Sequence, residues 1–176
     1  MKKFLISVML LLFVISCKTE NKIYPDIKPD QIGTKLLWDM NYADVKKILT
    51  EDFKLEFSQE MKQSDKYKIG KAYEFTGGKF NGFETVSWIP IIEYNGLIAL
   101  TINLKDLDPE RISELEKQLR NSLKPDTTYP SSDNRLILEK EGKRISEVQI
   151  LTKPEDNFVC VTYFKSFIKQ STVTQN

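Results

Sequence analysis

The thiols and the absence of histidine set the limits on the chemistry that this chain can perform. Its 176 residues include two cysteines, Cys17 and Cys160, and no histidine. Nucleophiles that rely on a histidine base are therefore excluded, and so are zinc sites with histidine ligands. Cys160 lies in the apolar run 158–164 without a cationic neighbour, so we expect a buried and unreactive thiol. The residue types predict no metal and no cofactor.

Two groupings of polar residues match reactive motifs but have simpler explanations. Ser166 and Lys169 fit the S-x-x-K string of penicillin-binding enzymes, which needs a much larger domain and companion motifs that are missing here. Asp106, Asp108 and Glu110 crowd together before a helix, where capping of the helix N-terminus accounts for them. We therefore expect a protein that is not an enzyme and has no catalytic residues. Acid–base chemistry by a carboxylate pair stays an open alternative.

The first residues have the three parts of a secretory signal peptide. Two lysines precede an apolar run over residues 4–15, and a small residue and Cys17 follow that run. The string Val14-Ile15-Ser16-Cys17 resembles the lipobox of bacterial lipoproteins. This resemblance implies that the signal peptide, residues 1–16, is removed and that Cys17 carries acyl chains. The membrane is then the first expected partner, through the lipid on Cys17.

This segment has two alternative interpretations. A helix that spans the membrane needs about 20 apolar residues, whereas the apolar run covers only residues 4–15. A cleaved signal peptide without lipid is the other alternative. One acyl chain binds a membrane weakly and two hold it stably, so the lipoprotein resemblance implies permanent attachment to the cell envelope. Lys18 replaces the Asp that marks inner-membrane retention, which favours the outer membrane, on its periplasmic or surface face.

The charge and the length of the sequence after residue 16 are those of an ordinary globular protein. Without Lys2 and Lys3, the 26 basic residues fall to 24 against 25 acidic ones, a net charge of −1. A nucleic-acid partner is excluded because it would require a basic surface. The length suits one folded domain. We expect a lipidated cysteine with a flexible linker over residues 17–31, a single domain over 32–170 and a polar tail over 171–176.

Hydrophobic periodicity predicts an α+β domain in the order helix, three or four strands, helix, three strands. A first helix is capped by Asn41, and a second is capped by Asp108 and ends at Lys124-Pro125. Asn95-Gly96 is a strong hairpin signal. The pattern favours an antiparallel sheet of about six or seven strands with two helices on one face. Strands are expected at residues 71–75, 83–94, 97–104, 135–140, 144–151 and 157–165.

The glycine-rich segment 76–83 is the candidate contact site. It places Phe80 and Phe83 beside three glycines, and glycines are poor in strand interiors and common in surface loops. We expect both rings to be exposed and to bind a partner protein. The alternative is a loop folded back on the core.

The segment from Trp38 to Leu49 resembles the opening helix of small bacterial envelope lipoproteins of the β-lactamase-inhibitor-like and outer-membrane assembly types. Gly33, Trp38, Val45 and Leu49 fit that pattern, while Asp39 stands where the pattern has glycine. The resemblance implies a binding or inhibitor-like module and assigns no functional residue. We expect a non-catalytic module that binds another envelope protein. The alternatives are an immunity or inhibitor protein against a toxin or hydrolase, and a carrier of a small ligand.

Overall fold

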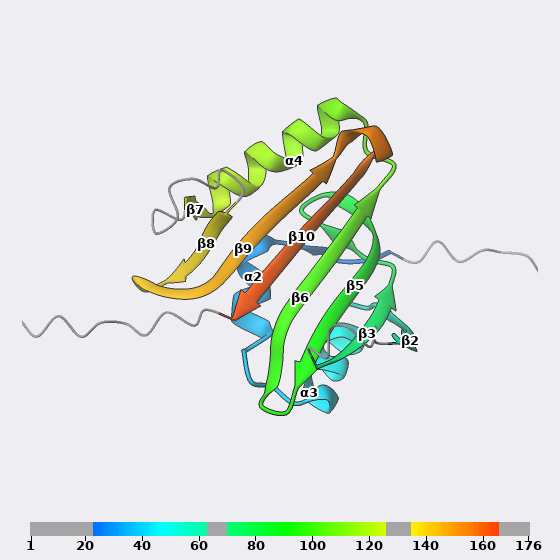
Figure 1. Ribbon diagram of the computed structural model, residues 1–176, viewed down its shortest axis with the longest axis vertical. Helices are drawn as coiled ribbons and strands as arrows, with labels where there is room; N and C mark the ends of the chain where they lie inside the picture. The colour runs from blue at the N-terminus through cyan, green and yellow to red at the C-terminus, as the bar shows by residue number, and fades with distance from the viewer. Residues whose placement is uncertain (1–22, 63–69, 126–134, 166–176) are drawn as a thin grey trace, which may run out of the picture.

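The computed structural model describes residues 23–62, 70–125 and 135–165 and shows an α+β fold built on one strongly curled sheet (Figure 1). The α+β class predicted from the sequence is confirmed. The helices are α2 (Pro29–Lys35), α3 (Tyr42–Lys47) and α4 (Pro109–Ser122), with a π-helical turn at Ile48–Asp52 and a 3₁₀ turn at Pro154–Asp156. The strands are β1 (Asp26–Ile27), β2 (Glu56–Glu60), β3 (Lys71–Thr76), β4 (Lys79–Phe80), β5 (Phe83–Glu93), β6 (Gly96–Lys105), β7 (Lys124–Pro125), β8 (Arg135–Lys140), β9 (Lys143–Lys153) and β10 (Phe158–Lys165).

The sheet has more strands than the sequence indicated. Its main path runs β1-β4-β5-β6-β10-β9-β8-β7, and β3 joins β5 with β2 beyond it. The prediction of six or seven strands was wrong because β1, β4 and β7 have two residues each and β2 is exposed along its whole length. Such strands carry no alternation of apolar and polar residues. The described pairs are antiparallel except β1 with β4.

The three helices of the described residues lie on one face of the sheet (Figure 1). The buried apolar side chains of the helices and the sheet form one core cluster. In α4 the side chain of Asp108 accepts a hydrogen bond of 2.8 Å from the backbone N–H of Arg111, as the capping prediction requires. The buried stripe of this helix consists of Ile112, Leu115 and Leu119. Asn41 likewise caps α3 by accepting a 3.0 Å bond from the backbone N–H of Asp44.

The hairpin between β5 and β6 is tied to the segment that precedes α3. Tyr94 and Asn95 form the turn, so Gly96 opens β6 instead of lying in the turn as predicted. The N–H of Asp39 donates to the carbonyl of Leu97 (3.1 Å), and the N–H of Leu97 donates to the carbonyl of Met40 (2.8 Å). These bonds bring the backbone of Asp39 against Gly96, whose φ is +102°. A side chain at position 96 has no room there.

Part of the predicted linker belongs to the folded domain. Residues 26–31 were expected to be flexible, but Ile27 and Pro29 are buried, and α2 begins at Pro29. The helix packs closely on the sheet, since a Cβ at Gly33 would lie 2.4 Å from the side chain of Leu138. The prediction failed because two prolines in a charged segment are typical of linkers, while Pro29 in fact occupies the first turn of a helix, where proline is favoured.

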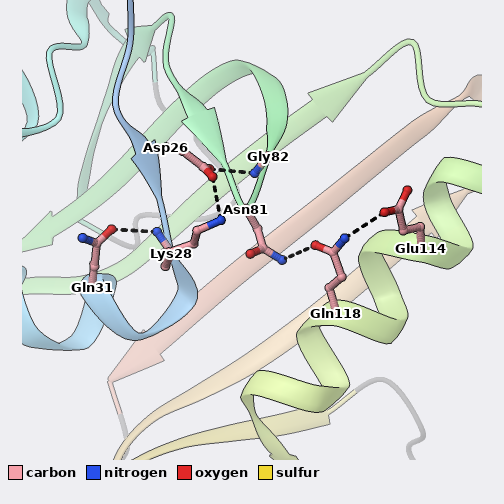
Figure 2. A network of polar contacts seen from close by, with 7 residues as sticks. All are labelled: Asp26, Lys28, Gln31, Asn81, Gly82, Glu114 and Gln118. Carbon is pink, nitrogen blue, oxygen red and sulfur yellow. Dashed lines mark hydrogen bonds and ion pairs between the residues drawn. The ribbon is translucent and has the colours of Figure 1, made fainter.

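A polar network holds this N-terminal strand in place (Figure 2). The carboxylate of Asp26 accepts 2.6 Å hydrogen bonds from the N–H of Gly82 and from the ammonium of Lys28. The N–H of Asn81 donates to the carbonyl of Ile27 (2.9 Å), and the Asn81 side chain donates to Gln118 on α4 (2.8 Å). The network therefore joins β1, the turn between β4 and β5, and α4.

Candidate functional site

The structure tests only some of the residues singled out from the sequence. Cys17, Ser166 and Lys169 lie outside the described residues. Asp106 has the left-handed backbone of a turn residue (φ +59°), and Asp108 acts as the helix cap. Among the described residues, no group of acidic or cysteine side chains is arranged to hold a metal ion. In that same part of the chain, no helix is long and apolar enough to cross a membrane.

The expectation that Phe80 and Phe83 are exposed was wrong. Phe80 is fully buried and Phe83 is 4% exposed. The ring of Phe80 packs edge-on against Trp88 and Tyr163, with ring centres 6.1 and 6.4 Å apart. The guanidinium of Arg111 lies 5.2 Å from the centre of the Phe83 ring. Both rings therefore belong to the core and its edge, which is the alternative that the sequence left open.

Phe80 and Phe83 are buried because of the register of the hairpin that β4 forms with β5. Phe80 on β4 is directly opposite Phe83 on β5, so both side chains point to the same face of the sheet, which is the helix-covered one. The glycines also serve the core, because the carbonyl of Gly77 accepts hydrogen bonds from Thr85 (2.7 Å) and from the indole of Trp88 (3.2 Å). The segment is a turn that closes over the core.

No helix of the described residues covers the opposite face of the sheet, and we name it the open face. It is formed by the side chains of β5, β6, β10 and β9 that point away from the helices. On β10 the buried residues Val159, Val161 and Tyr163 alternate with outward positions, and β9 alternates in the same way. The outward side chains are Phe158, Cys160, Thr162 and Phe164 on β10, Glu147, Gln149, Leu151 and Lys153 on β9, and Ala99, Thr101, Asn103 and Lys105 on β6.

The centre of the open face has no charged side chain, and charges are confined to its rim. Every outward residue of β10 is uncharged, and so are those of β6 up to Lys105 at its end. Large apolar groups are exposed here, since Leu151 is 50% and Phe164 is 37% exposed. Lys153 and Glu147 mark the two ends of the face on β9. Threonine, asparagine and glutamine are ordinary on a solvent-facing sheet, so the unusual feature is the lack of charge at the centre of the face.

Side-chain hydrogen bonds hold the central residues in fixed positions. The hydroxyls of Thr101 and Thr162 lie 3.2 Å apart on neighbouring strands, and Asn103 donates to the hydroxyl of Ser87 at 2.9 Å. Each bond joins two strands across the open face. The hydroxyls of Thr101 and Thr162 and the amide nitrogen of Asn103 are thus paired within the sheet, which lowers the cost of covering these groups with another surface.

Cys160 belongs to the open face and is only partly buried, whereas the sequence predicted a core position. Burial raises the pKa of its thiol, and the contact with the hydroxyl of Thr162 at 3.5 Å lowers it by a smaller amount. At neutral pH the protonated thiol is therefore favoured over the reactive thiolate. The sequence signal was available, because outward and inward residues alternate along 158–164, but both sets are largely apolar.

A shallow hollow of about 220 Å³ lies at one corner of the open face. It is smaller than the pockets of roughly 300–1,000 Å³ that hold drug-sized ligands. Arg135, Glu147, Val148, Gln149, Phe164 and Lys165 line it. Its position makes it an extension of the open face at the β8 and β9 side.

Two buried hydroxyls on the other face, under the helices, have no hydrogen-bond partner among the described residues. They belong to Tyr163 and Ser146, whose side chains are fully buried. Burial, followed by the nearby carboxylate of Asp30, raises the pKa of Tyr163, so the phenol stays neutral. An unpaired buried hydroxyl destabilises a fold. These groups lie apart from the open face.

Comparison with protein-family models, with curated proteins and with solved structures finds no match for this chain.

Proposed function

We propose that this chain is a lipid-anchored protein of the cell envelope that binds another protein on its open face and catalyses no reaction. The observation that carries the proposal is the uncharged centre of the open face within a charged rim. Protein interfaces have this anatomy, because charged residues are depleted from the buried centre and retained at the edge. Exposed Leu151 and Phe164 add apolar contact area at two separate places on the face, on either side of the row formed by Thr162 and Gln149.

The anchoring half of the proposal rests on the lipobox around Cys17. Cys17→Ser is expected to abolish labelling by a fatty-acid analogue, because no thiol remains at the modified position. The protein should then leave the membrane fraction or retain its signal peptide. Cys160→Ser is the matched control and should label as the natural chain does. Persistent labelling and membrane fractionation of Cys17→Ser would contradict lipidation at this residue.

The binding half is tested by a photo-reactive amino acid placed in the open face of the full chain. At position 151 it should form a crosslinked product with the partner in intact cells, because the Leu151 side chain is half exposed near the centre of the face. At position 94 it should form none, although Tyr94 is fully exposed on the β5–β6 turn. A product at 94 and none at 151 would show that the open face is not the interface.

The alternatives receive less support from the geometry. A small-ligand carrier requires a sizeable and mostly apolar cavity. The hollow at the corner of the open face has about 220 Å³, and a second, more open hollow of about 410 Å³ is lined mainly by charged residues, namely Glu60, Met61, Lys62 and Lys71. An immunity or inhibitor protein would use the same kind of face as a general binding module. It would be distinguished by the identity of the protein crosslinked at position 151.

A further inference from the structure

We propose that the protein bound on the open face is a second copy of this chain, packed face to face about a two-fold axis. The axis lies in the plane midway between the two sheets and runs perpendicular to the strands. It crosses β10 between Cys160 and Thr162. This inference depends on the proposed function, because it names the partner of the same face. It is carried by the order of the outward residues along β9 and β10.

Strand β9 is complementary to itself when its direction is reversed. Its outward residues are, in order, Glu147, Gln149, Leu151 and Lys153. A two-fold axis perpendicular to the strand places each strand over its own copy in the opposite direction. Glu147 then meets Lys153 of the second copy, and Gln149 meets Leu151. The acidic end of one copy therefore covers the basic end of the other.

Strand β10 is symmetric about the same point. Its outward residues are Phe158, Cys160, Thr162 and Phe164, so reversal places one phenylalanine over the other and Cys160 over Thr162. The pairing of the strands shows that the two centres coincide, because Thr162 is opposite Gln149 and Cys160 is opposite Leu151. One axis therefore satisfies both strands at once.

The charges distinguish this arrangement from the other face-to-face dimer. An axis running along β10 would place β9 over β6 of the second copy. Phe158 pairs with Lys153 on one side and with Lys105 on the other, so the two lysines lie on the same row of the sheet. Such an axis would bring Lys153 over Lys105 of the second copy, and like charges across an interface are unfavourable. The perpendicular axis is therefore the favoured one.

The two charged ends of β9 differ in how firmly they are held. Lys153 lies 3.9 Å from Asp156 and its side chain is 53% exposed, so this surface pair contributes little stability and Lys153 can turn to a new partner at small cost. Glu147 pairs with Arg144 at 3.1 Å, and the two side chains are only 23% and 14% exposed. Glu147 is therefore expected to meet Lys153 of the second copy while it keeps Arg144.

The size of the face predicts a weak dimer. Four strands and four outward rows cover on the order of 500 Å² of plane, from the spacing of strands and residues. A standard interface buries about 800 Å² per partner. Attachment to one membrane raises the effective concentration of the two copies, so the dimer is expected in the membrane and not in dilute solution. The test must therefore use the full, membrane-bound chain.

The experiment uses charge reversal with two differently tagged full-length copies in cells. Each copy carries the photo-reactive residue at position 151, and the product that contains both tags is measured. The natural pair should give this product. Glu147→Lys should lose it when present in both copies, because Lys meets Lys, and so should Lys153→Glu, because Glu meets Glu. A Glu147→Lys copy expressed with a Lys153→Glu copy should restore it, since all four facing charges are then opposite.

The outcomes separate the two proposals. The melting temperature of each variant checks its folding: Lys153→Glu should leave it unchanged, because that side chain is 53% exposed, while Glu147→Lys also removes the partner of Arg144 and should lower it without unfolding the protein. If a single variant keeps the two-tag product, or if the mixed pair does not regain it, the dimer is wrong. If position 151 crosslinks only a different protein, the dimer is wrong while the proposed binding function stands. If position 151 gives no product at all, both proposals are contradicted.

Discussion

Phe80→Ala is expected to lower the free energy of unfolding by about 3–5 kcal/mol, as measured by denaturant titration of the purified protein. The ring is fully buried and contacts Trp88 and Tyr163, so its removal leaves a cavity that these two large neighbours cannot easily fill. The effect should be global, because Phe80 also lies beside the network that fixes β1.

Tyr94→Ala is the matched control for the loss of an aromatic ring. Tyr94 is fully exposed at the tip of the β5–β6 hairpin, so its truncation should change stability by no more than about 0.5 kcal/mol. Equal effects of the two substitutions would show that the segment 77–83 does not pack on the core as the structure describes.

Gly96→Ala should lower stability by roughly 3 kcal/mol or more, because strain and overlap act together. The backbone at position 96 has φ +102°, and an added Cβ would lie 2.3 Å from the carbonyl oxygen of Asp39. The obstacle is backbone and not a flexible side chain. Relief would require breaking the hydrogen bonds of Leu97 with Asp39 and Met40.

Gly142→Ala separates the cost of a left-handed backbone from the cost of steric overlap. Gly142 also has a positive φ (+74°), but no atom lies within 4 Å of the added Cβ. Its cost should be only that of the left-handed backbone, about 1–2 kcal/mol. Thermal melts of both variants measure the difference. If Gly96→Ala costs no more than Gly142→Ala, the segment around Asp39 moves aside easily and is not fixed to the hairpin.

The elements that were predicted correctly are those whose signals are local. α4 has a cap, a proline in its first turn and a regular stripe around Leu115, which is indeed fully buried. The long strands β6 and β10 show clear alternation. β1 and β4 could not be found because two residues show no period, and their pairing joins segments more than 50 residues apart. Pairing at that distance depends on the complete fold.

The burial of Phe80 and the position of the open face could not be predicted for a different reason. Glycines around Phe80 correctly indicate a turn, but a turn can lie over the core as well as in solvent. Along β10 the sequence shows which residues share a face, since outward and inward positions alternate. It does not show which face the helices cover, because both sets are rich in apolar residues. The open face therefore becomes visible only when the helices are placed.

If Cys17 is acylated as proposed, the polar network around Asp26 limits how far the domain can stand from the membrane. Because β1 is fixed to the body of the protein, any free tether from an acylated Cys17 ends at Asp26, nine positions along the chain. Even fully extended, nine residues span no more than about 30 Å. In the anchored form, the domain is thus confined to a thin layer next to the bilayer, and only proteins whose own surfaces enter that layer can meet it.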